Sequence, residues 1–135
     1  MSNNVSYDLI WQISRANSSY IVKRKNCGGV QFSREPLNVT GFYTQAASGF
    51  ANKTAVGVVS SPKGIKLITK SAKNSKSAKV SSSTFKHSKD SRKIAAAVSK
   101  STVNHRDDLL EAAVAKASAL ARGRSAKKVY ASKRR

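Results

Sequence analysis

Apolar and polar residues are spaced differently in the two halves of the chain. Up to residue 70, short runs rich in β-branched and aromatic residues alternate with Gly, Pro, Asn and Ser, which is typical of strands and turns. From residue 90 to residue 123, apolar residues recur every three or four positions, which is typical of helices. The pattern predicts an α+β fold: a small antiparallel β-sheet of two hairpins with an N-terminal helix, then a basic connector and C-terminal helices.

A short N-terminal helix is predicted within residues 6–17. A serine precedes it as a polar cap, and Asp8 places negative charge in its first turn. Its apolar face should bury Ile10, Trp11 or Ile13 against the segments that follow.

Two hairpins follow this helix. The expected strands are 19–25 and 30–34, joined by the glycine-containing turn 26–29, and then 53–59 and 64–70, joined by 60–63. In the last of these strands Ile65, Leu67 and Thr69 share one face, and Lys66, Ile68 and Lys70 share the other. The second face is only half polar, as expected of a sheet with a charged partner lying across it.

The segment between the hairpins, residues 37–52, is predicted to be a loop with a possible helical turn. It contains Phe42, Tyr43 and Phe50. These rings are able to stack on unpaired bases, but aromatic side chains in a small domain more often belong to the core, and we expect that role.

Helical periodicity dominates the rest of the chain. Asp90 and Ser91 are positioned to cap a helix through about residue 101, with Ile94 and Val98 on one face. The last helix starts at the acidic sequence after Arg106 and ends at a glycine, and its apolar stripe comprises Leu110, Ala113, Val114, Ala117, Leu120 and Ala121.

Between strands and helices lies a stretch rich in lysine and serine, with too little apolar surface to fold alone. The predicted organisation is therefore an α+β globular part, a basic connector, a helical part and a basic tail, with bounds 1–70, 71–89, 90–123 and 124–135. The connector is expected to need a polyanion to be ordered.

Charge points to the same class of partner. The 135 residues include 26 Lys and Arg against 6 Asp and Glu, a net charge of +20. Residues 1–60 carry +4 and residues 61–135 carry +16. Such self-repulsion requires a negatively charged partner, either nucleic acid or an anionic membrane surface, and the basic residues lack the apolar face of an interfacial helix.

Other chemistry is not indicated. The single cysteine, Cys27, excludes an internal disulfide framework, and His87 and His105 have no second ligand at metal spacing. No phosphate-binding glycine loop or nucleophile motif is present. We expect no enzyme activity, no cofactor, no metal and no small-molecule substrate, and neither a membrane span nor a secretion signal.

Lysine spacing in the connector suits a chain of phosphates. Lys70, Lys73, Lys76 and Lys79 are three residues apart, or ~9–10 Å in extended backbone. Binding of this kind weakens steeply with salt and reads shape and backbone rather than sequence. The alternative is that the run is only a flexible, solubilising linker.

Several short motifs, in order, resemble the eukaryotic large-subunit ribosomal protein family numbered twenty-eight. Together they cover roughly half of the chain: Trp11, then 17–24 (NSSYIVKR), 32–38 (FSREPLN), 53–58 (KTAVGV) and 106–120 (RDDLLEAAVAKASAL). The resemblance implies a non-enzymatic structural protein of the cytosolic ribosome, assembled through the nucleolus, with ribosomal RNA and neighbouring ribosomal proteins as partners. It implies RNA contacts at Lys23, Arg24, Arg34 and Lys53.

Combined with charge, these considerations predict a longer set of RNA-binding residues: Lys23, Arg24, Lys25, Arg34, Lys53, Lys66, Lys70, Lys73, Lys76, Lys79, Lys86, Lys89, Arg92, Lys93, Lys127, Lys128, Lys133, Arg134 and Arg135. Two alternatives stay open. One is a chromatin protein of linker-histone-like character, although only two prolines are present. The other is an RNA-processing factor of similar fold.

Overall fold

The computed structural model describes residues 5–71, 79–86 and 90–123. Its elements are α1 (Tyr7–Asn17), β1 (Ile21–Lys23), the 3-10 turn η1 (Lys25–Cys27), β2 (Gln31–Ser33), β3 (Ala55–Ser61), β4 (Gly64–Ser71), β5 (Lys79–Lys86), α2 (Ser91–Val103), η2 (Asp107–Leu109) and α3 (Leu110–Gly123). The α+β class is confirmed. No helix in the described ranges has the length and apolar character needed to cross a membrane.

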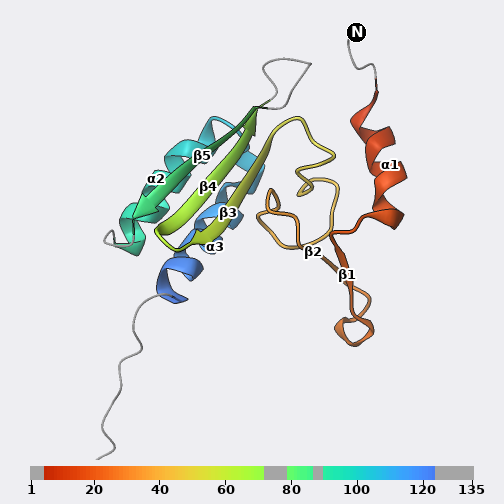
Figure 1. Ribbon diagram of the computed structural model, residues 1–135, viewed down its shortest axis with the longest axis horizontal. Coiled ribbons are helices and arrows are strands. Elements are labelled where there is room, and N and C mark those ends of the chain that lie inside the picture. The colour runs from red at the N-terminus through yellow and green to blue at the C-terminus, as the bar shows by residue number, and fades with distance from the viewer. Residues whose placement is uncertain (1–4, 72–78, 87–89, 124–135) are drawn as a thin grey trace, which may run out of the picture.

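The predicted hairpins form, but they belong to separate sheets. β1 and β2 make a two-stranded sheet, whereas β3, β4 and β5 make a three-stranded antiparallel sheet in that order. Figure 1 shows α2 and α3 against the larger sheet, with α1 and the β1–β2 hairpin to one side of it. A long loop, residues 34–54, connects the two sheets.

The strand β5 lies within the segment predicted as a connector, so the expectation that the connector needs a polyanion to be ordered is wrong for residues 79–86. All eight residues pair with β4, from Ser71 opposite Lys79 to Gly64 opposite Lys86. Little apolar surface is needed because β4 supplies the hydrogen-bonding edge, while Phe85 lies opposite Ile65 and packs against the core. The division of the chain into four parts, 1–70, 71–89, 90–123 and 124–135, stays a prediction.

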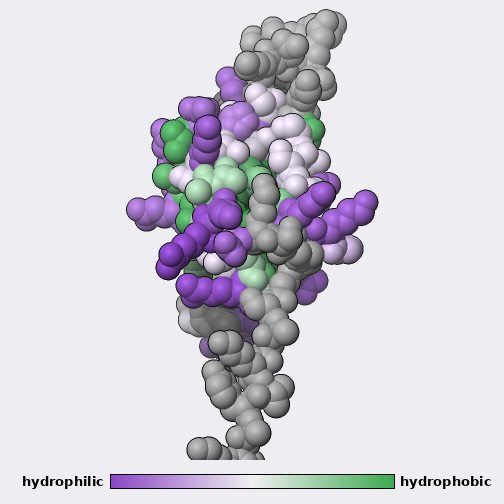
Figure 2. Space-filling model, turned by 90° about the vertical axis from the view of Figure 1, so that its left-hand side faces the viewer, coloured by the Kyte–Doolittle hydropathy of each residue, from purple (hydrophilic) through white to green (hydrophobic). Residues whose placement is uncertain are grey.

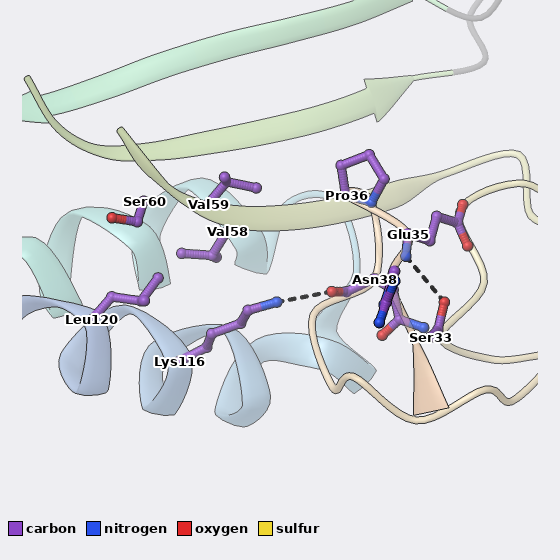
Figure 3. A pocket seen from close by; sticks show the side chains of 10 residues that line it. Ser33, Glu35, Pro36, Asn38, Val58, Val59, Ser60, Lys116 and Leu120 are labelled. Carbon is purple, nitrogen blue, oxygen red and sulfur yellow. Dashed lines mark hydrogen bonds between the residues drawn. The ribbon is translucent and has the colours of Figure 1, made fainter. Parts of the chain in front are cut away.

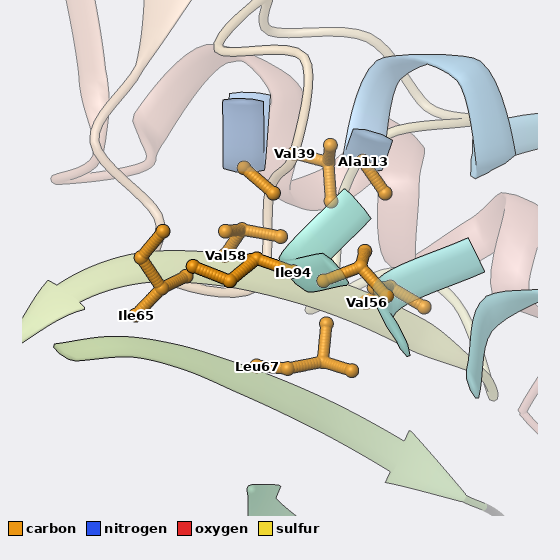
Figure 4. Packing of buried hydrophobic residues seen from close by; sticks show 9 residues of the cluster. Val39, Val56, Val58, Ile65, Leu67, Ile94 and Ala113 are labelled. Atoms are coloured by element: carbon orange, nitrogen blue, oxygen red, sulfur yellow. The ribbon is translucent and has the colours of Figure 1, made fainter. Parts of the chain in front are cut away.

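One hydrophobic core joins the sheet to both helices. Val56 and Val58 from β3 and Ile65 and Leu67 from β4 share one face of the sheet, as their register requires. They pack against Ile94 and Val98 of α2, Ala113 and Ala117 of α3, and Val39 from the long loop, all at most 3% exposed (Figure 4). The alanines let α3 approach closely. The predicted stripe of α2 therefore faces the core, as do Ala113, Ala117, Leu120 and Ala121 of the predicted stripe of α3.

The helix α1 contributes nothing to this core, and the prediction of a buried apolar residue on it is wrong. Ile10 and Trp11 are half-buried, and Ile13 is 68% exposed. The helix is held instead by Tyr43, whose ring centroid lies 5.0 Å from that of Trp11 and whose hydroxyl donates to the Ser14 carbonyl at 3.1 Å.

Candidate nucleic-acid interface

Three basic side chains are turned inward and bind carbonyl groups of the long loop. The Lys70 ammonium donates to the carbonyls of Gly49 and Asn52 at 2.7 and 2.9 Å. The Lys116 ammonium on α3 donates to the Asn38 carbonyl at 3.0 Å. These contacts join the loop to the sheet and to α3. The positive charges of Lys70 and Lys116 therefore have partners within the protein, although composition alone assigns them to a polyanion.

Arg106 is the third of these side chains. Its guanidinium donates to the carbonyls of Thr54 and Ala46, at 2.9 and 2.7 Å, and binds the Asp108 carboxylate with two hydrogen bonds of 2.8 and 2.6 Å. The pKa of Asp108 is lowered by these hydrogen bonds from Arg106. Arg106 thus connects both ends of the loop segment 46–54 to the start of the last helical region.

Glu35 and Lys70 face the same part of the loop. Burial raises the pKa of Glu35, against the opposing effect of backbone N–H groups of Gly49 and Phe50 and of the nearby Lys70 charge. Burial also lowers the pKa of Lys70. Lys70 is among the residues predicted to bind RNA, but its ammonium binds the loop carbonyls of Gly49 and Asn52 instead.

The loop also covers part of the open face of the sheet. A side chain on Gly57 would overlap the Pro36 carbonyl, and Lys70 reaches loop carbonyls from the same face. The expectation of a charged partner across this whole face is therefore wrong at the end nearest residues 55 and 70. There the chain's own backbone fills the space, and its carbonyl oxygens meet the positive charge.

The rest of that face is open and basic. Lys66 lies opposite Thr84, and Lys86 lies opposite Gly64, so the two lysines are diagonal neighbours ~7–8 Å apart on one face. Ser82 and Thr84 are exposed between and beside them. This arrangement presents ammonium and hydroxyl donors side by side, which suits phosphate oxygens.

A second basic surface follows the outer side of α2. Arg92, Lys93 and Lys100 are all exposed, and they span ~12 Å of the helix. Lys93 lies 3.9 Å from the exposed carboxylate of Asp90, a contact that contributes little in water. Hydrophilic side chains project over much of the side of the molecule that carries α2 (Figure 2).

A third basic surface is the tip of the β1–β2 hairpin. Lys23, Arg24 and Lys25 are exposed where the chain turns through Gly28, which has a positive φ of 61°. Arg34 is exposed just after β2. The hairpin therefore carries its charge away from the core, as the sequence predicts.

The structure says less about the remaining residues that are predicted to bind RNA. Lys53 is exposed, and its ammonium lies 4.9 Å from the centre of the Tyr7 ring. Lys79 begins β5, but its side chain is not described. Eight residues lie outside the described ranges, namely Lys73, Lys76, Lys89, Lys127, Lys128, Lys133, Arg134 and Arg135.

The aromatic residues of the long loop do not behave as predicted. Phe42 is 49% exposed and Phe50 is 64% exposed, so assigning them to the core is wrong. Phe42 stacks on Phe32 of the hairpin, with ring centroids 5.7 Å apart, while Tyr43 is half-buried against α1. The core is filled by aliphatic side chains from the sheet, from both helices and from Val39, and the rings of Phe42 and Phe50 are not part of it.

Sequence reasoning also missed basic residues that the fold exposes. Lys63 lies in the two-residue turn between β3 and β4, and Lys100 lies on α2; both are exposed. In the sequence only the charge of each lysine marks it, because no cluster of basic residues lies next to it. Conversely, the inward direction of Arg106 and Lys116 follows only from contacts with residues far away in the sequence.

Comparison with known proteins defines the class to which this molecule belongs. The family model described as the Ribosomal L28e protein family matches residues 9–123. The chain belongs to this family of ribosomal proteins, which confirms the resemblance carried by the sequence motifs.

Two relatives share the name Large ribosomal subunit protein eL28. The relative from Schizosaccharomyces pombe is 41% identical over 137 residues, covering 95% of this chain and 99% of its own length. The relative from Caenorhabditis elegans is 34% identical over 77 residues, covering 57% of this chain and 60% of its own. The expectation of a non-enzymatic protein is confirmed by this membership, and the chromatin alternative is not favoured.

Proposed function

We propose that this large-subunit ribosomal protein of the cytosolic ribosome binds ribosomal RNA as a structural constituent, through three separate basic surfaces. These are the hairpin tip with Lys23, Arg24 and Lys25, the open sheet face with Lys66 and Lys86, and the outer side of α2 with Arg92, Lys93 and Lys100. Assembly through the nucleolus belongs to the same proposal.

The observation that carries the proposal is the lack of internal partners for these charges. Within residues 5–71, 79–86 and 90–123, only Lys93 and Arg106 lie within salt-bridge distance of a carboxylate. The other cations on the three surfaces therefore depend on water or an external anion. A polyanion that neutralises them releases its own counterions, which makes binding favourable and salt-dependent.

The placement of the surfaces favours folded RNA over a DNA duplex. The α2 surface lies on the side of the larger sheet covered by helices, whereas Lys66 and Lys86 lie on its opposite face. A straight duplex contacts one side of a small domain, but folded RNA is able to contact several. Recognition by shape and phosphate positions requires no base-specific side chains.

Filter binding of the full chain to large-subunit ribosomal RNA across a salt series tests this proposal. Replacing Lys66 and Lys86 together by Gln should reduce the slope of log affinity against log salt by about 0.7–0.9 for each phosphate that is no longer neutralised. The triple change of Arg92, Lys93 and Lys100 to Gln should do the same. Arg15→Gln is the matched control, because Arg15 is exposed but lies on α1, outside the three surfaces.

Two results would count against the proposal. One is RNA binding whose salt slope is the same in the wild type and in both multiple variants. The other is equal or tighter binding to duplex DNA of matched length, which would support the chromatin alternative. Absence of the tagged chain from the large-subunit peak of a sucrose gradient at moderate salt would remove the ribosomal placement itself.

A further inference from the structure

The two faces of the β1–β2 hairpin have different surroundings. Tyr43 runs beside β2, and its backbone N–H donates to the Gln31 carbonyl at 2.9 Å. Its side chain lies on the face that α1 covers, where it contacts Trp11 and the Ser14 carbonyl. Neighbouring residues of an extended chain point to opposite faces. Phe42 therefore lies on the other face of the hairpin, which α1 leaves open.

An aromatic row crosses this second face. Phe32 of β2 pairs with Val22 of β1 on one side and forms an isolated bridge with Phe42 on the other, so the three side chains share one face. The rings of Phe32 and Phe42 stack, with their centroids 5.7 Å apart. Phe32 thus covers one side of the Phe42 ring, while Phe42 is 49% exposed. The exposed part offers a flat surface on which another ring is able to continue the stack.

An exposed arginine lies on each side of this row. Arg24 follows Val22 by two residues and has extended backbone, with φ −130° and ψ 119°, so it shares the face of Val22. Arg34 follows Phe32 by two residues, and its backbone N–H donates to the Tyr20 carbonyl at 2.9 Å, which continues the pairing of the strands. Because the strands are antiparallel, the two arginines lie on opposite sides of the row, each ~7 Å along its strand. We call this surface the open hairpin face and define it by Tyr20, Val22, Arg24, Phe32, Arg34 and Phe42.

The two arginines have no carboxylate partner. Neither forms a salt bridge within residues 5–71, 79–86 and 90–123. Arg34 borders a cavity of about 390 Å³ between the segment after β2, the strand β3 and α3, where the Lys116 ammonium binds the Asn38 carbonyl (Figure 3). The acidic residue in the lining of this cavity is Glu35, whose carboxylate is turned toward the long loop and accepts a hydrogen bond from the Ser48 hydroxyl. The guanidinium groups of the open hairpin face are therefore available to an external anion.

The combination of rings and positive charge favours RNA over a neighbouring protein. An apolar protein surface would cover the two guanidinium groups without supplying partners, which is costly. Single-stranded RNA supplies both kinds of group, because its bases stack on aromatic side chains and its phosphates bind guanidinium. A duplex offers this face its phosphates alone, since its bases are stacked on one another.

We propose that the open hairpin face binds a single-stranded segment of ribosomal RNA, with one base stacked on Phe42 and backbone phosphates at Arg24 and Arg34. The inference rests on the proposed RNA-binding function and makes it more specific. The exposed Lys23 and Lys25 of the hairpin tip accept any phosphate, whereas the aromatic row requires an unpaired base. Every base has a π-face, so this site selects unpaired over paired RNA and does not select one base over another.

The test measures binding of the full chain to two RNA probes of equal length, one single-stranded and one a duplex. A stacked base contributes about tenfold or more to affinity, so Phe42→Leu should bind the single strand about tenfold more weakly and the duplex as tightly as the wild type does. The salt slope for the single strand should stay the same, because no phosphate contact is lost. Replacing Arg24 and Arg34 together by Gln should instead reduce that slope by about 0.7 for each phosphate that is no longer neutralised.

Phe50→Leu is the matched control. Phe50 is 64% exposed but belongs to the long loop and pairs with neither strand of the hairpin, so its replacement should leave both affinities unchanged. Phe42→Trp covers the case in which Phe42→Leu fails to fold, because it keeps a ring at this position. Its added fluorescence should be quenched by the single strand and not by the duplex, relative to a wild type whose single tryptophan, Trp11, packs against Tyr43 on the covered face. Absence of this quenching would overturn the stacking site.

The results separate this inference from the function on which it rests. Salt-dependent binding of both probes that Phe42→Leu leaves unchanged would refute stacking and leave general RNA binding intact. No binding of either probe or of ribosomal RNA by the wild type would refute both. An equal loss for single strand and duplex would show that Phe42 supports the hairpin rather than a base. Unchanged RNA binding, with Phe42→Leu missing from the large-subunit peak of a sucrose gradient, would assign the open hairpin face to a neighbouring protein instead.

Discussion

Replacing Arg106 should destabilise the protein although the residue is not part of the hydrophobic core. Its side chain is only 14% exposed and makes hydrogen bonds with Thr54, Ala46 and Asp108. Arg106→Met keeps the aliphatic part of the side chain and removes every one of these bonds. The loop segment 46–54 then loses its connection to the region that precedes α3.

The magnitude follows from the surroundings of each partner. A hydrogen bond to a charged group contributes about 1.5 kcal/mol at the lower end of its range, which suits the half-buried Thr54 carbonyl. Ala46 is exposed, so water replaces part of its bond and about 0.5–1 kcal/mol is lost. Asp108 is 53% exposed, and its ion pair contributes about 0.5 kcal/mol. The expected loss in the free energy of unfolding is therefore about 3 kcal/mol.

Urea unfolding measures this loss, followed by far-ultraviolet circular dichroism and by fluorescence of the single tryptophan. Trp11 packs against Tyr43, with ring centroids 5.0 Å apart, and therefore reports on the long loop. Both signals should shift together, because Val39 ties this loop to the core. Arg106→Lys should recover about 1 kcal/mol, since an ammonium lacks the planar fork that reaches several acceptors.

Arg92→Met is the control, because Arg92 is exposed on α2 and its removal should change stability by less than about 0.5 kcal/mol. If Arg106→Met and Arg92→Met lower the free energy of unfolding by the same small amount, the contacts of Arg106 contribute nothing to stability. A loss seen by fluorescence but not by circular dichroism would show that the loop unfolds independently of the sheet and helices.

Two further predictions follow from the close packing of the long loop. Gly57→Ala should lower the free energy of unfolding by about 2–4 kcal/mol, because the added methyl overlaps backbone at Pro36 that cannot move aside. Thermal or urea unfolding measures this loss. Gly123→Ala is the control and should be neutral, since its added methyl meets nothing within 4 Å. The folded state holds the Glu35 proton more tightly than the unfolded chain does, because burial raises the pKa of Glu35 above its ordinary 4.5. The contribution of Glu35 to the free energy of unfolding is thus fully present below pH 4.5, and it is lost as pH rises through the raised pKa. Unfolding measured at several pH values should show this decline in the wild type and a flatter profile in Glu35→Gln; a wild-type profile that rises relative to the variant in this window would contradict the assignment.

Part of the architecture could be predicted because its signals are local. Pro62 and Lys63 form the turn of the second hairpin, and the alternation of Ile65 and Leu67 with Lys66 fixes which face is buried. The periodic Ile94 and Val98 likewise place α2 on the core. Such periodicities reflect the geometry of a single strand or helix, which neighbouring residues determine.

The candidate sites were predictable only in part, because charge in a sequence does not say where a side chain points. Lys23, Arg24 and Lys25 follow a strand into a turn, so their exposure could be foreseen. Lys70 and Lys116 are equally evident as cations in the sequence, yet their ammonium groups donate hydrogen bonds to loop carbonyls. Their partners lie 18 to 78 residues away in the chain, a separation that no local pattern encodes.

The sequence by itself determined the α+β class, the two hairpins, the helices of the second half, the positive charge and the family. Only the tertiary structure decided that the serine-rich segment 79–86 becomes β5, that Phe42 and Phe50 stay outside the core, and that a cavity with a half-buried Lys116 forms beside β3. The physical reason is the same in each case. A polar strand is stable only where another strand offers its edge, and a half-buried cation such as Lys116 needs a hydrogen-bond acceptor, here the Asn38 carbonyl, which a distant part of the chain supplies.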